Sequence, residues 1–156
     1  MKKVVSLILL FLMCFGITAC AKAYTKIGSS EFSIAIPKGY VLSEDELDED
    51  QIGYYYKDDD SIDFDVYQWE KEGVYTLEEE AEYFAAEYGT EPEKITINGI
   101  QGMKYVSSEE FDGYEYTVVN YMFEDDNYII ELSFWTIDTA EEYKAVDDII
   151  NTIKKN

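Results

Sequence analysis

The chain has 156 residues, with 34 acidic side chains against 12 basic ones, all lysine, and a formal net charge of −22 at pH 7. Such a charge repels nucleic acid and anionic lipid headgroups, so we expect no nucleic-acid partner. The chain also has no histidine, which excludes a Ser-His-Asp triad and a histidine-based zinc site.

Residues 1–20 have the pattern of a targeting segment. Two lysines at the start are followed by an apolar run over residues 4–17, which is too short for a membrane span and suits a signal sequence. Residues 17–20 read Ile-Thr-Ala-Cys, which resembles the lipobox of bacterial lipoproteins. The resemblance implies a signal peptide over residues 1–19, acylation of Cys20, and anchoring on the extracytoplasmic face of the cell membrane. An ordinary secretory signal is the alternative.

The remaining chain divides into a short tether and one domain. Residues 20–30 are polar and show no periodicity, so we expect them to separate the domain from the lipid. Residues 31–156 have the length of a single domain. Because Cys14 leaves with the signal peptide and Cys20 carries lipid, the domain has no disulfide and no cysteine nucleophile.

Three strands are predicted in the first part of the domain. Large apolar residues alternate over residues 32–36, and Pro37 ends that strand. Further strands are predicted at residues 52–56 and 62–69, and the second of these changes phase after Val66, which indicates a bulge. The connecting segments are acidic.

A helix and a β-meander follow, and a second helix closes the chain. Thr76 and Glu79 have the spacing of a capping box, apolar residues then recur at helical spacing to Tyr88, and Gly89 ends the helix. Strands are predicted around a type I′ turn at Asn98-Gly99 and over residues 102–107, 114–123 and 128–135.

The closing helix also begins with a capping box, formed by residues 139–142. Its apolar stripe is predicted to be buried, and Lys154 and Lys155 are placed at its negative C-terminal end. The residues of the stripe are Tyr143, Val146, Ile149, Ile150 and Ile153. The predicted fold class is therefore α+β, an antiparallel sheet of six to seven strands packed by two helices in the order βββα-βββ(β)-α.

Several of these segments resemble one family of small secreted or lipid-anchored domains. Residues 32–40 read Phe-Ser-Ile-Ala-Ile-Pro-Lys-Gly-Tyr, residues 126–134 read Asp-Asn-Tyr-Ile-Ile-Glu-Leu-Ser-Phe, and residues 148–153 read Asp-Ile-Ile-Asn-Thr-Ile. Together with the central helix and the Asn-Gly strand, this is similar to the PsbP-like/DcrB-like family. The resemblance implies an antiparallel sheet flanked by helices, no enzymatic activity, and an accessory role beside a membrane complex.

The acidic loops are a candidate calcium site. Calcium takes six to eight oxygen ligands, mainly from carboxylates and carbonyls. Asp48, Asp50, Asp58 and Asp60 could supply such ligands if the two loops lie at one edge of the sheet. The alternative is that the loops are solvated and bind nothing, in which case no cofactor is expected.

Aromatic residues on neighbouring strands are a candidate interaction patch. Tyr55, Tyr67 and Trp69 combine large rigid rings with polar tips, as residues of protein and sugar interfaces do. The alternative is that they form the core of the sheet beneath a helix.

These observations favour a membrane-anchored, extracytoplasmic lipoprotein that is an interaction module of an envelope protein complex and has no enzymatic activity. The alternative is a ligand-binding lipoprotein for Ca²⁺ or an oligosaccharide. A pair of carboxylates at glycosidase spacing would arise by chance among so many acids, so such a pair would not by itself indicate a hydrolase.

Overall fold

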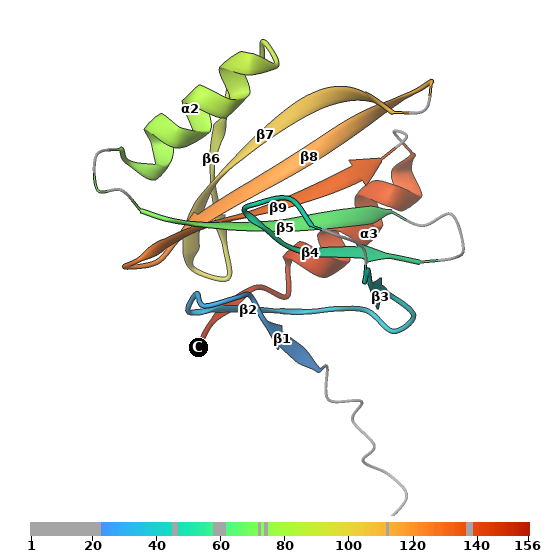
Figure 1. Cartoon of the computed structure of the whole chain (residues 1–156), viewed down its shortest axis with the longest axis horizontal. Helices are drawn as coiled ribbons and strands as arrows, with labels where there is room; N and C mark the ends of the chain where they lie inside the picture. The colour runs from blue at the N-terminus through green and yellow to red at the C-terminus, as the bar shows by residue number, and fades with distance from the viewer. Residues whose placement is uncertain are drawn as a thin grey trace, which may run out of the picture.

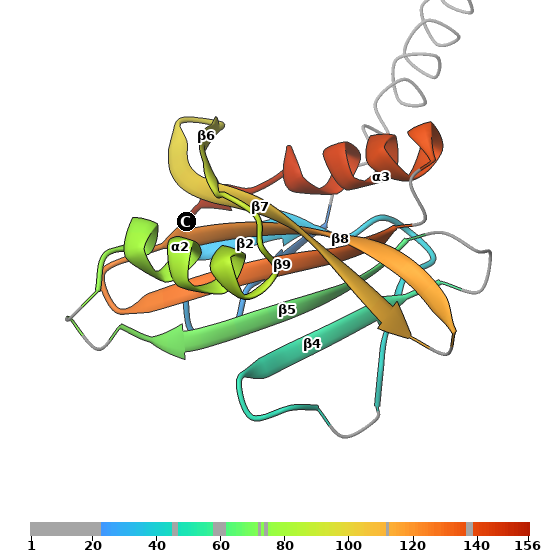
Figure 2. The same cartoon turned by 90° about the horizontal axis from the view of Figure 1, so that it is seen from above.

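The computed structural model describes residues 23–44, 47–57, 62–71, 73, 75–111, 113–136 and 139–156. Its centre is a seven-stranded antiparallel sheet with helix α2 (Leu77–Glu87) on one face. Helix α3 (Ala140–Ile150) and a three-stranded sheet cover the opposite face (Figures 1 and 2). The predicted α+β class, with an antiparallel sheet and two helices, is confirmed. Within the described part of the chain, no helix has both the length and the apolar character needed to span a membrane.

The large sheet combines a meander with strands from the first half of the domain. Its spatial order is β3-β4-β5-β9-β8-β7-β6, and every pairing is antiparallel. The bounds are β3 (Val41–Leu42), β4 (Gln51–Tyr56), β5 (Asp63–Glu70), β6 (Glu93–Ile97), β7 (Ile100–Phe111), β8 (Tyr114–Glu124) and β9 (Tyr128–Thr136). Strand β9 therefore lies at the centre of the sheet, between β5 and β8.

Local sequence signals fix several ends of these elements. Asn98 and Gly99 both have positive φ, 53° and 81°, as the predicted type I′ turn between β6 and β7 requires. Thr76 caps α2 and Thr139 caps α3, and in each case the glutamate three residues later completes a capping box.

The bulge lies on a different strand from the one predicted. Strand β5 pairs with β9 without interruption over all its residues, so the change of phase after Val66 is not a bulge. Phe64 and Val66 are buried on the face of the main core, while Tyr67 and Trp69 lie on the other face, because successive residues of a strand point to opposite faces. The irregularity occurs on β4, between Gln51 and Gly53.

The three-stranded sheet was not expected from the sequence. It has the order β1-β2-β10, with bounds β1 (Tyr24–Lys26), β2 (Phe32–Ala35) and β10 (Lys154–Lys155). Residues 24–30, assigned above to the tether, thus contribute a strand, and Ile27 and Ser30 are buried.

The closing helix is shorter than predicted. Helix α3 ends at Ile150, and the chain then turns so that Lys154 and Lys155 pair with β2 instead of extending the helix. Ile153 is still buried, but from the turn after the helix. Tyr143, placed in the buried stripe, is 40% exposed, because it lies at the edge of the helix face that meets the sheet.

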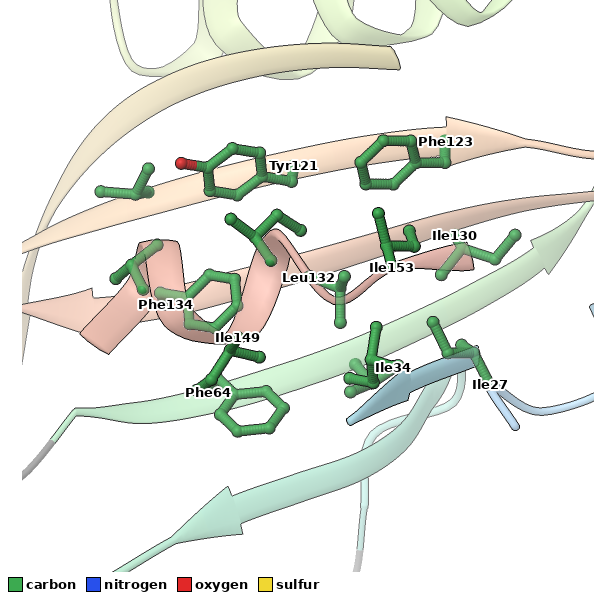
Figure 3. Close-up of a cluster of buried hydrophobic side chains, with 14 of the residues drawn as sticks. Ile27, Ile34, Phe64, Tyr121, Phe123, Ile130, Leu132, Phe134, Ile149 and Ile153 are labelled. Atoms are coloured by element: carbon green, nitrogen blue, oxygen red, sulfur yellow. The ribbon is translucent and has the colours of Figure 1, made fainter. Parts of the chain in front are cut away.

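The main core lies between the large sheet, α3 and the small sheet. Alternate residues of β9 and β8 meet the apolar face of α3 and the residues of β2, as Figure 3 shows for the labelled side chains. Phe134 stacks on Phe64 with ring centroids 5.2 Å apart, and Tyr121 meets Phe134 edge-on at 5.9 Å. The largest buried side chains are concentrated in this layer.

A second, smaller core lies under α2 on the other face. Leu77, Ala81 and Ala85 of the helix pack on Met103, Tyr105, Met122 and Ile129 of the sheet. Because α2 has only 11 residues, it covers one end of this face. The other end of the face, which includes parts of β5, β9 and β8, is left without a helix.

Candidate functional site: a groove beside helix α2

A groove of about 1050 Å³ lies on the sheet face beside α2. We call it the α2 groove. Its base is formed by β5, β9, β8 and β7, one side by α2, and the other by the segment that leads into β4. A smaller hollow of about 410 Å³ continues from it and shares Asp48, Asp65, Tyr67 and Trp135 with it. Ligand sites in proteins have volumes in this range.

Aromatic side chains form much of the surface of the α2 groove. They come from β5, β7, β9 and α2, and are Tyr67, Trp69, Phe84, Tyr88, Tyr105 and Trp135. Trp69 meets Phe84 of the helix edge-on at 5.7 Å, and Trp135 meets Tyr116 edge-on at 5.8 Å. These contacts position Trp69 and Trp135, which are the two tryptophans of the chain and both lie in the groove.

Helix α2 contributes to the groove through one side only. Glu80, Phe84 and Tyr88 line the groove at spacing i, i+4, i+8, so they share one helix face. Tyr88 is the C-terminal cap residue of the helix, and its hydroxyl donates to Oε1 of Glu109 on β7 at 3.3 Å. This contact joins the end of the helix to the edge of the sheet.

Glu131 lies at the base of the groove and is only 7% exposed. Its Oε1 accepts hydrogen bonds from the Tyr105 hydroxyl at 2.7 Å and from the Ser133 hydroxyl at 3.2 Å. Burial raises the pKa of this carboxyl, and the two hydrogen bonds offset only part of that effect. No described protein group donates to its Oε2.

Asp65 is the second buried carboxylate, on the neighbouring strand β5, and is 5% exposed. The indole Nε1 of Trp135 donates to its Oδ2 at 2.6 Å, and the Gln51 side chain donates to its Oδ1. Burial raises its pKa, and the negative charges of Asp63 and Glu109 add to the rise. Both of its oxygens therefore have protein donors, in contrast to those of Glu131.

Acidic groups outnumber basic ones among the described residues that line the groove. Further carboxylates surround its opening, namely Asp48, Glu49, Asp50, Glu70, Glu80 and Glu109. The pKa of Tyr67 is raised above its ordinary value by burial and then by the charges of Asp65 and Glu131. Burial and the charge of Glu131 raise the pKa of Tyr105 in the same way.

Lys71 is the one basic residue among the described groups that line the groove. Its ammonium pairs with Glu124 at 2.6 Å and donates to the carbonyl of Asp125 at 3.2 Å. Since these partners lie at the end of β8 and in the turn that follows it, the lysine is held at one end of the groove and does not neutralise the buried carboxylates.

The predicted aromatic patch is split between the two faces of the sheet. Tyr67 and Trp69 line the α2 groove, but Tyr55 faces the main core and stacks on Phe64 with centroids 4.9 Å apart. Neighbouring residues of a strand point to opposite faces, and the run of tyrosines at 54–56 gave no sign of which tyrosine faces which side.

The predicted calcium ligands are not gathered in the described part of the structure. Asp48 and Asp50 are exposed at the opening of the groove, and no group of three acidic side chains among the described residues has an arrangement that could hold a metal ion. Asp58 and Asp60 lie outside the described residues, as does Cys20. The calcium site therefore stays a prediction.

The sequence did not indicate which strand residues form the base of the groove. Glu131, Asp65, Tyr105 and Trp135 all lie on strands, at positions that alternate with core residues. The one sequence signal that could have pointed to the groove was Glu131, a charged residue on the second face of the otherwise apolar strand β9. Without knowledge that β9 is the central strand, that signal indicates a solvated face.

The fold is similar to two solved structures. A protein of Bacteroides thetaiotaomicron matches with a TM-score of 0.62 at 17% identity, over 86% of this chain and 49% of that one. The present chain thus spans about half the length of the Bacteroides protein. Cyanobacterial PsbP (CyanoP) of Synechocystis sp. PCC 6803 matches with a TM-score of 0.54 at 13% identity, over 92% of this chain and 97% of the other.

This chain has a PsbP-like fold. The predicted resemblance is thereby confirmed at the level of the fold, which is what identities of this size show. No protein-family model matches the sequence, and no curated protein matches it. The function is therefore inferred from the groove itself.

Proposed function

We propose that this protein is a lipid-anchored, extracytoplasmic lipoprotein whose PsbP-like domain is a non-catalytic binding module of an envelope protein complex. The observation that carries the proposal is the α2 groove, in which aromatic rings surround buried carboxylates on a half-covered sheet face. Rigid aromatic rings in a concave site are typical of protein and ligand binding. The lipobox-like residues 17–20 support the anchor.

The chemistry of the groove favours binding over catalysis. Asp65 has a protein donor on each oxygen, and Glu131 has two donors on one oxygen, so both carboxylates are held as hydrogen-bond acceptors. The domain from residue 21 onward contains no histidine or cysteine to act as a nucleophile or as its base.

An alternative is a ligand-binding lipoprotein. Trp69 and Trp135 in a groove with hydrogen-bonding groups favour an oligosaccharide, because sugar rings stack on aromatic faces. Calcium at Asp48 and Asp50 is the other form of this alternative.

Site-specific photocrosslinking in cells tests the binding module. A photoreactive phenylalanine at Tyr88, which is 43% exposed beside the groove, is expected to give a discrete crosslinked product. The same group at Tyr143, which is 40% exposed on α3, is the matched control and is expected to give none of that product. Equal patterns at the two positions, or no product at either, would contradict binding of a partner at the groove.

Metabolic labelling with an alkyne fatty acid tests the anchor. The substitution Cys20→Ala is expected to abolish labelling, because the thioether forms on that sulfur. The substitution Cys14→Ala removes the other cysteine of the same segment and is expected to leave labelling unchanged. Persistent labelling of Cys20→Ala would exclude the proposed lipidation.

A further inference from the structure

We infer that the α2 groove binds an organic cation, an alkylammonium or guanidinium group, with Glu131 as its principal anionic partner and the surrounding aromatic rings as its cage. The inference deepens the proposed function and rests on it, since it assigns a ligand chemistry to the same groove. The cation could belong to a free polyamine or to a lysine or arginine side chain of a partner polypeptide.

The hydrogen bonding of Glu131 is incomplete. Its Oε1 accepts from Tyr105 and Ser133, but its Oε2 has no donor among the described residues, although the side chain is 93% buried. A buried carboxylate oxygen without a donor is costly, and proteins seldom contain one without a reason. A ligand that donates a hydrogen bond and carries positive charge would satisfy it.

Aromatic rings lie in the same groove as that carboxylate. Tyr105 touches Glu131 directly, Tyr67 is paired with it across the β5–β9 ladder, and Trp69, Trp135 and Tyr88 lie in the same groove. Ring faces attract cations, and the attraction is greater where water is excluded. A carboxylate combined with aromatic rings thus selects an ammonium or guanidinium group over a neutral donor.

The charges that line the groove are not balanced. Carboxylates outnumber lysine eight to one among the described residues that line the groove, and the ammonium of Lys71 is already paired with Glu124. An anionic ligand would be repelled, and a neutral one would leave this charge uncompensated. A small inorganic ion fits less well, because no described cluster offers the three acidic ligands of a metal site and the rings offer none.

The size of the groove indicates an extended ligand rather than a single small amine. Its volume of about 1050 Å³ is at the upper end of small-molecule sites, and the carboxylates at its opening extend from Asp48 to Glu109. A chain with several spaced positive charges could place one charge at Glu131 and others near the opening.

Tryptophan fluorescence is a direct readout, because both tryptophans of the chain lie in the groove. Full-length protein in detergent would be titrated with spermidine and, separately, with a capped Ala-Lys-Ala-Lys-Ala peptide. The acetyl-lysine form of that peptide, magnesium at matched ionic strength and maltohexaose are the control ligands. We expect saturable binding of spermidine, of the lysine peptide or of both, and the ligand that binds more tightly identifies the source of the cation.

Two variants with the same change of charge make the test specific. Glu131→Gln keeps the shape of the side chain. It is expected to weaken binding of the cation tenfold or more, because one charge-assisted hydrogen bond is lost. Glu141→Gln, on the exposed first turn of α3, is expected to leave binding unchanged. Circular dichroism of both variants would verify that they fold.

Three results would overturn the inference. Binding of the cations to Glu131→Gln as tightly as to the wild type would show only general attraction to the acidic surface. A response to maltohexaose, with none to the cations, would favour a sugar site. If no ligand gives a response but the crosslink at Tyr88 forms, the cation site is rejected and the proposed binding module still stands. If the crosslink at Tyr88 does not form either, both the cation site and the binding module are rejected.

Discussion

The substitution Phe134→Ala is expected to lower the free energy of unfolding by about 3–5 kcal/mol. Phe134 is fully buried at the centre of the main core, between Phe64 at 5.2 Å and Tyr121 at 5.9 Å. Strand β9 is hydrogen-bonded on both sides, so the backbone cannot move inward to fill the resulting cavity. A large part of the stability of a domain this size would be lost.

Urea denaturation followed by far-UV circular dichroism measures this effect. The midpoint is expected to fall with little change of slope. Tyr114→Ala is the control, since Tyr114 is an aromatic residue on the neighbouring strand that is 67% exposed, and its replacement is expected to change the free energy by less than about 0.5 kcal/mol. A loss below about 1 kcal/mol for Phe134→Ala would contradict the described core.

The substitution Glu131→Gln is expected to stabilise the protein at pH 8 and to flatten the dependence of its stability on pH. Burial raises the pKa of Glu131 above its usual 4.5, so between pH 4.5 and that raised pKa the folded protein holds a proton that the unfolded chain has already released. The folded state then binds more protons than the unfolded state, and stability falls as the pH rises through the folded pKa.

Other groups that face Glu131 act in the same direction or titrate elsewhere. The pKa of Asp65 is also raised by burial, so its contribution is likewise lost with rising pH, and the charge of Glu109 raises the pKa of both carboxyls. The pKa of Tyr105 is raised well above the range of the experiment. The fall in stability above about pH 4.5 is therefore expected to be reduced, but not removed, in Glu131→Gln.

Thermal unfolding between pH 5 and pH 8 tests this prediction. Relief of an incompletely paired buried acceptor is worth about 1–3 kcal/mol, which corresponds to several degrees in Tm for a domain of this size. Glu141→Gln removes one charge from an exposed position and is the matched control. The same pH profile in both variants would show that net charge, and not the burial of Glu131, governs the effect.

Signals confined to a few neighbouring residues were sufficient for most elements. The capping boxes at Thr76 and Thr139 and the turn at Asn98-Gly99 formed as predicted, because each is completed by hydrogen bonds or backbone angles within four residues. Alternation in β9 also placed Leu132 and Phe134 correctly in the core. These features follow from chain geometry alone.

The ends of the domain could not be predicted in this way. Strands β1 and β10 are only three and two residues long, and they exist because each pairs with β2. Lys154 and Lys155 have the composition of a helix end, but helix α3 stops at Ile150. The backbone partners of the two lysines lie in β2, more than a hundred residues earlier in the chain. No local pattern contains that information.

The sequence by itself determined the composition of the site, and the tertiary structure decided where those residues lie. The sequence shows that the chain is rich in acids and tyrosines, has two tryptophans, and lacks histidine and arginine. Which of them are buried depends on β9 lying at the centre of the sheet and on α2 covering only one end of it. Glu131 and Asp65 become the base of a groove because partners distant in the chain exclude water around them, and exclusion of water is a property of the packed fold rather than of any segment.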